Sequence, residues 1–147
     1  MTTAFAERDP AISPDGRWLA YTSNESGRAE VYVRPFPSGG GRWQISDAGG
    51  AFPRWARNGK ELFYLDRTGR LVSVALPGGD PRRAGAPRPL YDTGLQASSS
   101  FDQFAVGPKD RFLLRIPFGI DPGVPVHVVL GWSRPADEVR ERDGRAP

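Results

Sequence analysis

The side chain best suited to catalysis in this 147-residue chain is its single histidine, His127. It lies in the apolar run Val126–Val128, which is typical of a β-strand, and no Gly-x-Ser-x-Gly nucleophile motif accompanies it. Hydrolysis of the serine type needs a nucleophile, a base and an acid in one geometry. We therefore interpret His127 as a packed or edge-strand residue. We expect no catalytic residues, and the chain is predicted not to be an enzyme.

The residues that could bind metal or phosphate also have structural interpretations. The aspartates lie mostly at turns, where a carboxylate bonds its own backbone, and none follows the Asp-x-Asp-x-Asp-Gly spacing of a calcium loop. The chain has no cysteine and therefore no thiolate metal site. Ser38–Gly41 is glycine-rich but is not followed by Lys-Ser/Thr or by a helix, so we interpret it as a hairpin loop. We expect neither a metal nor a cofactor.

The charge pattern argues against nucleic acid as a partner. The formal net charge is +3, and nearly all the cations are arginines that alternate with acids and turns. Nucleic-acid binders instead cluster their cations. No stretch approaches the ~20 apolar residues of a membrane span. Residues 1–8 contain Glu7 and no long apolar run, so no signal peptide is visible and the sequence leaves the compartment open.

The chain is organised around a turn, Ser13–Gly16, which separates a short strand from the bulky residues Trp18–Tyr21. Proline presets φ, aspartate bonds nearby backbone N–H groups, and glycine adopts a positive φ. A shift of 43 residues carries this stretch onto Ala56–Tyr64, and a third, weaker copy begins at Gly107. The residues predicted to form these repeated turns are Ser13, Pro14, Asp15, Gly16, Asn58, Gly59, Pro108 and Asp110.

Each copy has room for four strands whose side chains are apolar on both faces, which indicates small sheets packed face to face. The predicted strands of the first copy are 9–13, 17–24, 29–34 and 42–46, and those of the second are 51–55, 60–66, 70–75 and 88–91, with a loop at 76–87. The third copy offers strands at 100–106, 111–116 and 124–132. We therefore predict an all-β fold, a partial β-propeller of about 2.75 four-stranded antiparallel blades, open or completed by oligomerisation. The expected division is a lead-in at 1–8, blade 1 at 9–50, blade 2 at 51–98, an incomplete blade 3 at 99–132 and a polar tail at 133–147.

The repeated turn, followed by an aromatic and aliphatic strand, resembles the blades of the TolB-like β-propeller family. Besides the turn residues, the match rests on Pro10 and Trp18–Tyr21 in the first copy. In the second copy it rests on Pro53, Trp55 and Leu62–Tyr64. The resemblance implies the propeller fold and says nothing about a ligand.

Further segments resemble the propellers fused behind bacterial serine/threonine kinase domains, namely Glu30–Val33 with Pro35–Pro37, Arg88–Tyr91 and Val128–Trp132. The resemblance implies the C-terminal part of a longer propeller, a non-enzymatic binding or scaffold module such as the sensor region of a kinase. That region would be periplasmic or extracytoplasmic. The chain departs from the pattern because it has fewer than the usual four to eight blades and none of the kinase motifs. The alternatives are the propeller remnant of a prolyl-oligopeptidase-type peptidase and a free-standing TolB-like cell-envelope protein.

The expected partner is a protein or peptide, the missing blades of the propeller, or a second copy of the chain. An open propeller exposes an apolar face and unpaired strand edges at its ends, so we expect oligomerisation or poor solubility. Propellers bind partners through loops. The loop side chains that packing explains least are Arg28, Phe36, Phe118 and Ile120.

Overall fold

The computed structural model describes residues 5–95, 104–108 and 111–114. The described part is all-β, apart from two short 3-10 helices. The predicted strand Val124–Trp132, together with Asp110, Phe118, Ile120 and His127, lies outside the described residues. The predicted division of the chain into blades therefore stays a prediction at its C-terminal end.

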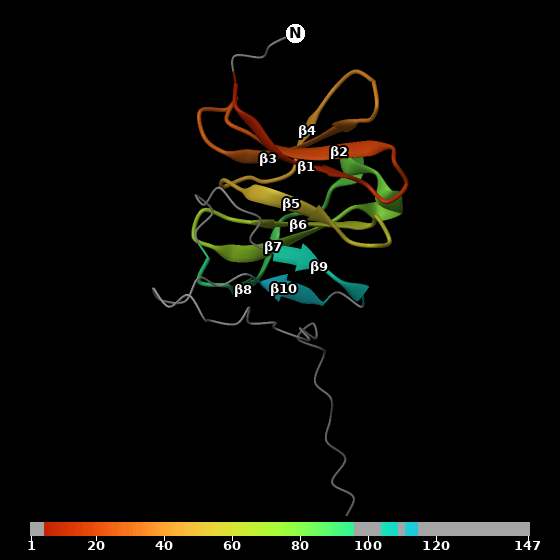
Figure 1. The fold of residues 1–147 in the computed structure, drawn as a ribbon. Coiled ribbons are helices and arrows are strands. Elements are labelled where there is room, and N and C mark those ends of the chain that lie inside the picture. Colours follow the sequence, from red (N-terminus) through yellow and green to blue (C-terminus); the bar gives the residue numbers. More distant parts are fainter. Residues whose placement is uncertain (1–4, 96–103, 109–110, 115–147) are drawn as a thin grey trace, which may run out of the picture.

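Within the described residues, ten strands form three antiparallel sheets, which lie as successive layers in Figure 1. The first sheet contains β1 (Glu7–Ile12), β2 (Trp18–Ser23), β3 (Glu30–Pro35) and β4 (Trp43–Gln44), in that order. The second contains β5 (Ala51–Trp55), β6 (Glu61–Leu65), β7 (Arg70–Ala75) and β8 (Arg88–Asp92), in that order. The third sheet has β9 (Phe104–Val106) beside β10 (Phe112–Leu114).

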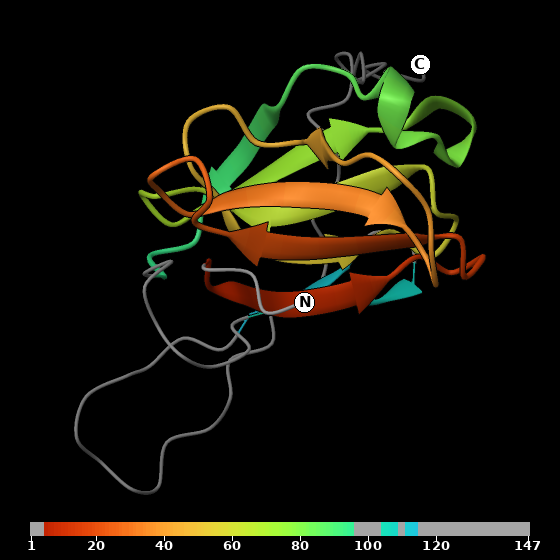
Figure 2. The ribbon, with the colours of Figure 1, turned by 90° about the horizontal axis from the view of Figure 1, so that it is seen from above.

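Each four-stranded sheet runs up and down in sequence order, and the strands of the first sheet cross over those of the second in Figure 2. The first strands of successive sheets meet, because β1 contacts β5 and β5 contacts β9. Four-stranded meanders that stack face to face with their first strands together are blades of a β-propeller. The prediction of an all-β, partial propeller is confirmed.

The repeated turn has the predicted chemistry. Ser13 Oγ donates to Asp15 Oδ1 at 2.6 Å and accepts from the N–H of Trp18 at 3.0 Å. Gly16 has a φ of 73° and donates its N–H to the Ser13 carbonyl at 2.9 Å. In the second copy Asn58 Oδ1 accepts from the Lys60 N–H at 2.9 Å, and the glycine after it has a φ of 67°. The side chain of the Asp/Asn residue thus fixes the turn in both copies.

A bulge also repeats in the first strand of both sheets. Asp9 and Phe52, which are 43 residues apart, have φ values of 56° and 59°, and each precedes a proline. The pairing registers of β1 with β2 and of β5 with β6 shift at these residues. A positive φ is unfavourable for a residue with a side chain. Its recurrence at the same repeat position shows that the two sheets share backbone detail beyond their strand order.

The core consists of two layers, one on each face of the second sheet. Leu62 and Tyr64 pack toward the first sheet against Ala20, Val31 and Val33, and all five are buried. Phe63 and Leu65 alternate with them and pack toward the third sheet. On that side the buried partners include Phe104, Phe112 and Leu114. The second sheet is therefore apolar on both faces, as the sequence predicts.

Several elements differ from their predicted extents. The last strand of the first sheet, predicted at 42–46, is only Trp43–Gln44, although the next residue still bonds β3 through Ile45 N and the Val31 carbonyl at 2.8 Å. The loop predicted at 76–87 contains the 3-10 helices η1 (Pro77–Gly79) and η2 (Pro81–Arg83). Prolines at the start of each helix suit these short turns.

Candidate functional site

The predicted contact residues are separated in the structure. Arg28 lies before β3 with its side chain 48% exposed, while Phe36 lies in the loop after β3 and is 38% exposed. The Phe36 N–H donates to the Arg17 carbonyl at 2.9 Å, which ties that loop to the first repeated turn. Phe118 and Ile120 fall outside the described residues. A binding role for these four side chains stays a prediction.

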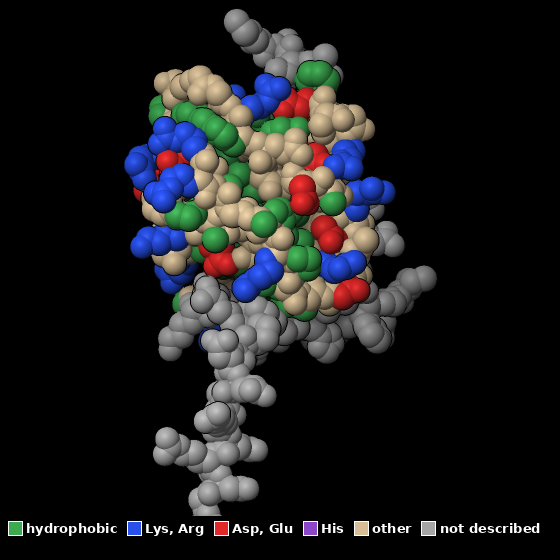
Figure 3. Space-filling view, turned by 180° about the vertical axis from the view of Figure 1, so that it is seen from behind, with side chains coloured by type: hydrophobic (Ala, Val, Ile, Leu, Met, Phe, Trp, Pro, Cys, Tyr) green, Lys and Arg blue, Asp and Glu red, His purple; other side chains and the backbone are tan. Residues whose placement is uncertain are grey.

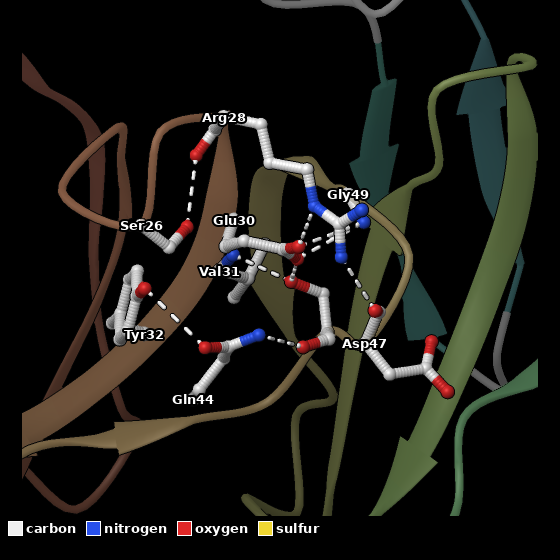
Figure 4. Close-up of polar contacts among 9 residues, drawn as sticks. Ser26, Arg28, Glu30, Val31, Tyr32, Gln44, Asp47 and Gly49 are labelled. Atoms are coloured by element: carbon white, nitrogen blue, oxygen red, sulfur yellow. Dashed lines mark hydrogen bonds and ion pairs between the residues drawn. The ribbon is translucent and has the colours of Figure 1, made fainter.

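Arg28 belongs to a polar cluster centred on a buried carboxylate, Glu30, which is 0% exposed (Figure 4). Arg28 Nε donates to Glu30 Oε1 at 2.5 Å, and Arg28 Nη2 donates to the Asp47 carbonyl at 2.7 Å. The other carboxylate contacts are the Ser46 hydroxyl and the N–H of Gly49, which is 3.0 Å from both oxygens. Ser46 Oγ also accepts from the N–H of β3 residue Val31 at 2.8 Å.

The Glu30 cluster connects β3 to the segment that leads from the first sheet into the second. Buried charges are tolerated when they are paired and their hydrogen-bonding capacity is used. Both oxygens of Glu30 have donors within the cluster, which indicates a structural role in holding the connection. Sequence reasoning missed this role, although an acid opening the apolar strand Glu30–Val33 is a signal that could have pointed to it.

A second feature is the first-sheet outer face, the side of the first sheet that points away from the second sheet. Cross-strand pairs place Ile12 beside Leu19, Leu19 beside Arg34, and Tyr21 beside Tyr32. These residues alternate with the ones that pack on the second sheet, so they occupy the opposite face. The tyrosine rings stack at 6.0 Å between centroids, and Arg34 lies over the Tyr21 ring at 5.7 Å.

A hollow of about 330 Å³ opens on the first-sheet outer face, with Phe5, Tyr21, Arg34 and Arg42 in its lining. Phe5 is 49% exposed. Glu25 in the lining pairs with Arg42, Oε1 to Nε, at 2.6 Å. Burial raises the pKa of Tyr21, and the carboxylates of Glu25 and Glu7 raise it further. The hydroxyl therefore stays protonated at neutral pH, and the hollow is aromatic with charged edges.

A third feature is a cleft of about 350 Å³ between the two repeated turns, which we call the turn cleft. Three elements line it, namely the first repeated turn, the second repeated turn and η1. The lining residues are Pro14, Asp15 and Arg17 from the first turn, Asn58, Gly59 and Lys60 from the second, and Gly78 and Gly79 from η1. A hydrogen bond from Ser13 and then the bonds from Arg17 lower the pKa of Asp15 to about 2. Asp15 is thus ionised under ordinary conditions. Sequence reasoning identified these turns but not the cleft between them.

Metal clusters, membrane-length helices and surface charge are three further features that bear on the function of the described residues. Within it, no group of three or more His, Cys, Asp or Glu residues is arranged to hold a metal ion. No helix among the described residues has the length and hydropathy needed to cross a membrane. On the face drawn in Figure 3, Lys and Arg side chains are interspersed with Asp and Glu, which gives no single basic field.

The sheets define the class of protein, an all-β chain with a partial β-propeller fold. No family model and no curated protein matches the sequence. Among solved structures, the chain is similar to a protein from Agrobacterium tumefaciens that is assigned as a TolB, with 20% identity and a TM-score of 0.47. The match covers 58% of this chain and 33% of that chain, so it spans about a third of the other protein's length.

Proposed function

We propose that this chain is a non-enzymatic binding and scaffold module that uses the first-sheet outer face to dock a further β-propeller blade. The observation that carries the proposal is a comparison of equivalent faces. The pairs Ile12–Leu19 and Tyr21–Tyr32 in the first sheet occupy the positions of Trp55–Leu62 and Tyr64–Val72 in the second. The face of the second sheet is covered by the first sheet, whereas no described residue of another sheet covers its counterpart.

Burial differs between the two faces at the position that Ile12 and Trp55 share. Trp55 is 8% exposed and donates its indole N–H to the Ala11 carbonyl of the first sheet at 2.9 Å. Its counterpart Ile12 is 51% exposed. Covering an aliphatic side chain of this size contributes on the order of 1 kcal/mol or more. Tyr21 and Tyr32 on the same face are 6% and 5% exposed, so the exposed part lies around Ile12. There the first-sheet outer face has the apolar residues of a blade–blade contact without a covering sheet among the described residues.

The charge on this face bears on the identity of the docked blade. Arg34 stands where the second sheet has Val74, because each pairs with the equivalent leucine of the neighbouring strand. A docked blade has to leave room for the guanidinium or offer it an acceptor, since an unpaired buried charge is costly. We expect a sheet with small apolar residues, like Ala20 and Val33 on the covered side, and an acceptor near Arg34.

The second part of the proposal concerns the longer protein to which this chain would belong. The segments that resemble kinase-fused propellers, Glu30–Val33 among them, support a place in the sensor region of a bacterial serine/threonine kinase. Such a region would be outside the cytoplasm and would bind a protein or peptide. An in-frame propeller and kinase domain encoded upstream of Met1 would support this, whereas an upstream signal peptide alone would favour a free-standing TolB-like protein.

The docking face is tested by association of the purified chain. We expect light scattering to show self-association, and a hydrophobic dye to bind. Ile12→Lys should shift the mass toward one protomer, because it places a charge on the exposed apolar part of the face. Ile12→Val is the matched control and should associate like the parent chain. A monomer without dye binding, or equal association of both variants, would contradict the proposal.

The absence of catalysis is tested separately. We expect no turnover of peptide, ester or nucleoside triphosphate substrates by the purified chain. Turnover that His127→Ala abolishes would overturn the non-enzymatic assignment and leave the docking result unaffected.

A further inference from the structure

We propose that the turn cleft binds a carboxylate group of an acidic peptide. This site is separate from the first-sheet outer face, and the inference does not rest on blade docking. The cleft lies where the first and second repeated turns approach each other beside η1. A Cβ added at Gly59 would be 3.7 Å from Pro14 Cδ, and one added at Gly79 would be 3.3 Å from the Gly59 carbonyl. Small residues therefore form the base and leave charged side chains at the edge.

The two turns carry equivalent residues with different charges. Asp15 corresponds to Asn58 and Arg17 corresponds to Lys60 after the 43-residue shift. In the first turn the carboxylate compensates the cation, because Arg17 Nε donates to Asp15 Oδ2 at 2.7 Å. In the second turn the residue before the glycine is an amide, and its oxygen is used by the Lys60 backbone N–H. The position equivalent to Asp15 therefore carries no charge that could pair with Lys60.

Two cationic groups remain available for a ligand. Within the described residues the ammonium of Lys60 has no ion pair. Arg17 is 66% exposed in its side chain, and only its Nε is engaged by the described residues. Its terminal nitrogens are thus available to form the paired hydrogen bonds that suit a carboxylate. The ammonium adds a point charge from the opposite turn.

The net charge of the lining favours a monoanion. Arg17 and Lys60 contribute two positive charges and Asp15 one negative charge, because the low pKa of Asp15 keeps it ionised. A carboxylate balances the single excess charge. A phosphate dianion would exceed it and would be repelled by Asp15 more strongly than a carboxylate is. The volume of about 350 Å³ is enough for one or two peptide side chains.

The test uses a fluorescein-labelled tetraglutamate peptide, with tetraglutamine as the uncharged comparison and with inorganic phosphate and free glutamate as competitors. We expect the full chain to bind tetraglutamate more tightly than tetraglutamine, measured by fluorescence anisotropy. Lys60→Gln should weaken this binding about fivefold, the size typical of an exposed charge pair. Asn58→Asp should weaken it similarly, because the new carboxylate reproduces the acid–base pair of the first turn.

Arg57→Gln is the matched control. It removes one positive charge from the neighbouring position, which is not in the cleft lining, and should change affinity less than about twofold. Equal losses in Arg57→Gln and Lys60→Gln would mean a non-specific charge effect and would overturn the proposal. Equal affinity for the two peptides, or displacement by phosphate at concentrations comparable to free glutamate, would also overturn it. Circular dichroism of each variant shows whether the fold is kept, and Asn58→Asp provides a second test if Lys60→Gln fails to fold.

Discussion

The β2–β3 hairpin of the first sheet and the β6–β7 hairpin of the second perform the same task with different chemistry. Each holds the segment that leads into the next sheet. In the second sheet the backbone does this, because the Gly69 carbonyl accepts from the N–H and hydroxyl of Thr93 at 3.1 and 2.5 Å. In the first sheet the Ala29 carbonyl accepts from Gly50 at 3.0 Å, and the buried Glu30 adds a second attachment.

The two hairpins differ in length and in the position of their acid, because Asp66 corresponds to Ser23 and the counterpart of Glu30 is Arg70. The second hairpin is a tight turn in which Asp66 Oδ1 accepts from the N–H groups of Thr68 and Arg70 at 2.8 and 3.0 Å. The Asp66 carboxylate therefore accepts hydrogen bonds from the backbone of its own turn. The first hairpin has two more residues between its strands, and its acid, Glu30, reaches the connecting segment. Repetition of the fold therefore does not mean repetition of the interactions that hold it.

We expect the largest loss of stability at a glycine, and the two hairpins provide a matched pair of glycines. Both Gly69 and Gly27 have positive φ values, 82° and 89°. A Cβ at Gly69 would lie 1.8 Å from the Leu95 carbonyl oxygen, whereas a Cβ at Gly27 meets nothing within 4 Å. We expect Gly69→Ala to lower the free energy of unfolding by about 3 kcal/mol or more. Gly27→Ala should cost about 1–2 kcal/mol from backbone strain alone.

These two variants are measured by urea unfolding followed through tryptophan fluorescence. Equal losses would mean that contact with the next segment adds nothing in the second hairpin. The comparison between the hairpins would then fail.

The next effect compares the two hairpin acids. Glu30→Gln keeps the shape of the side chain but removes the ion pair with Arg28. It also replaces one acceptor oxygen of the carboxylate with an NH2 group that can only donate. We expect a loss of about 2 kcal/mol in the free energy of unfolding, because the site is buried while the arginine stays partly hydrated. Asp66→Asn, in the more exposed turn, should cost about 1 kcal/mol. A smaller loss for Glu30→Gln than for Asp66→Asn would reverse the proposed difference.

The smallest effect concerns pH and compares the two repeated turns. The pKa of Asp15 is about 2 in the folded chain, below the value of about 3.9 in an unfolded one. Its contribution to stability is therefore present above about pH 4 and is lost as the pH falls toward 2. Because the side chain is exposed, we expect less than about 1 kcal/mol. The second repeated turn has Asn58 at the equivalent position, and an amide does not titrate, so that turn should not contribute to this loss.

The pH effect is measured as the difference between the parent chain and Asp15→Asn in urea unfolding at pH 5 and pH 2.5. The parent chain should lose more stability across this range than the variant. Identical losses would show that the hydrogen bonds of Asp15 do not depend on its charge.

Local patterns predict most of the described strands but not their interactions. The strands at Ala51–Trp55 and Arg70–Ala75 have their predicted bounds, because alternating bulky residues and a glycine turn are properties of neighbouring residues. The short last strand of the first sheet was predicted too long. Its pairing depends on β3 and on the connection to the next sheet rather than on its own residues.

The candidate sites were harder to predict for the same reason. Arg28 was singled out as a loop side chain, but its engagement with Glu30 and Asp47 required knowing where the chain returns after β4. The turn cleft required two turns 43 residues apart to face each other. No pattern within either turn contains that information.

The sequence by itself determined the turns, the strand periodicity and the repeat, because proline, aspartate and glycine restrict φ locally and alternation assigns side chains to two faces. The tertiary structure decided which of those faces is covered, that Glu30 has donors from a distant segment, and that Lys60 has no ion pair among the described residues. Burial and charge compensation depend on neighbours in space. For this chain those neighbours are often a whole blade away in sequence.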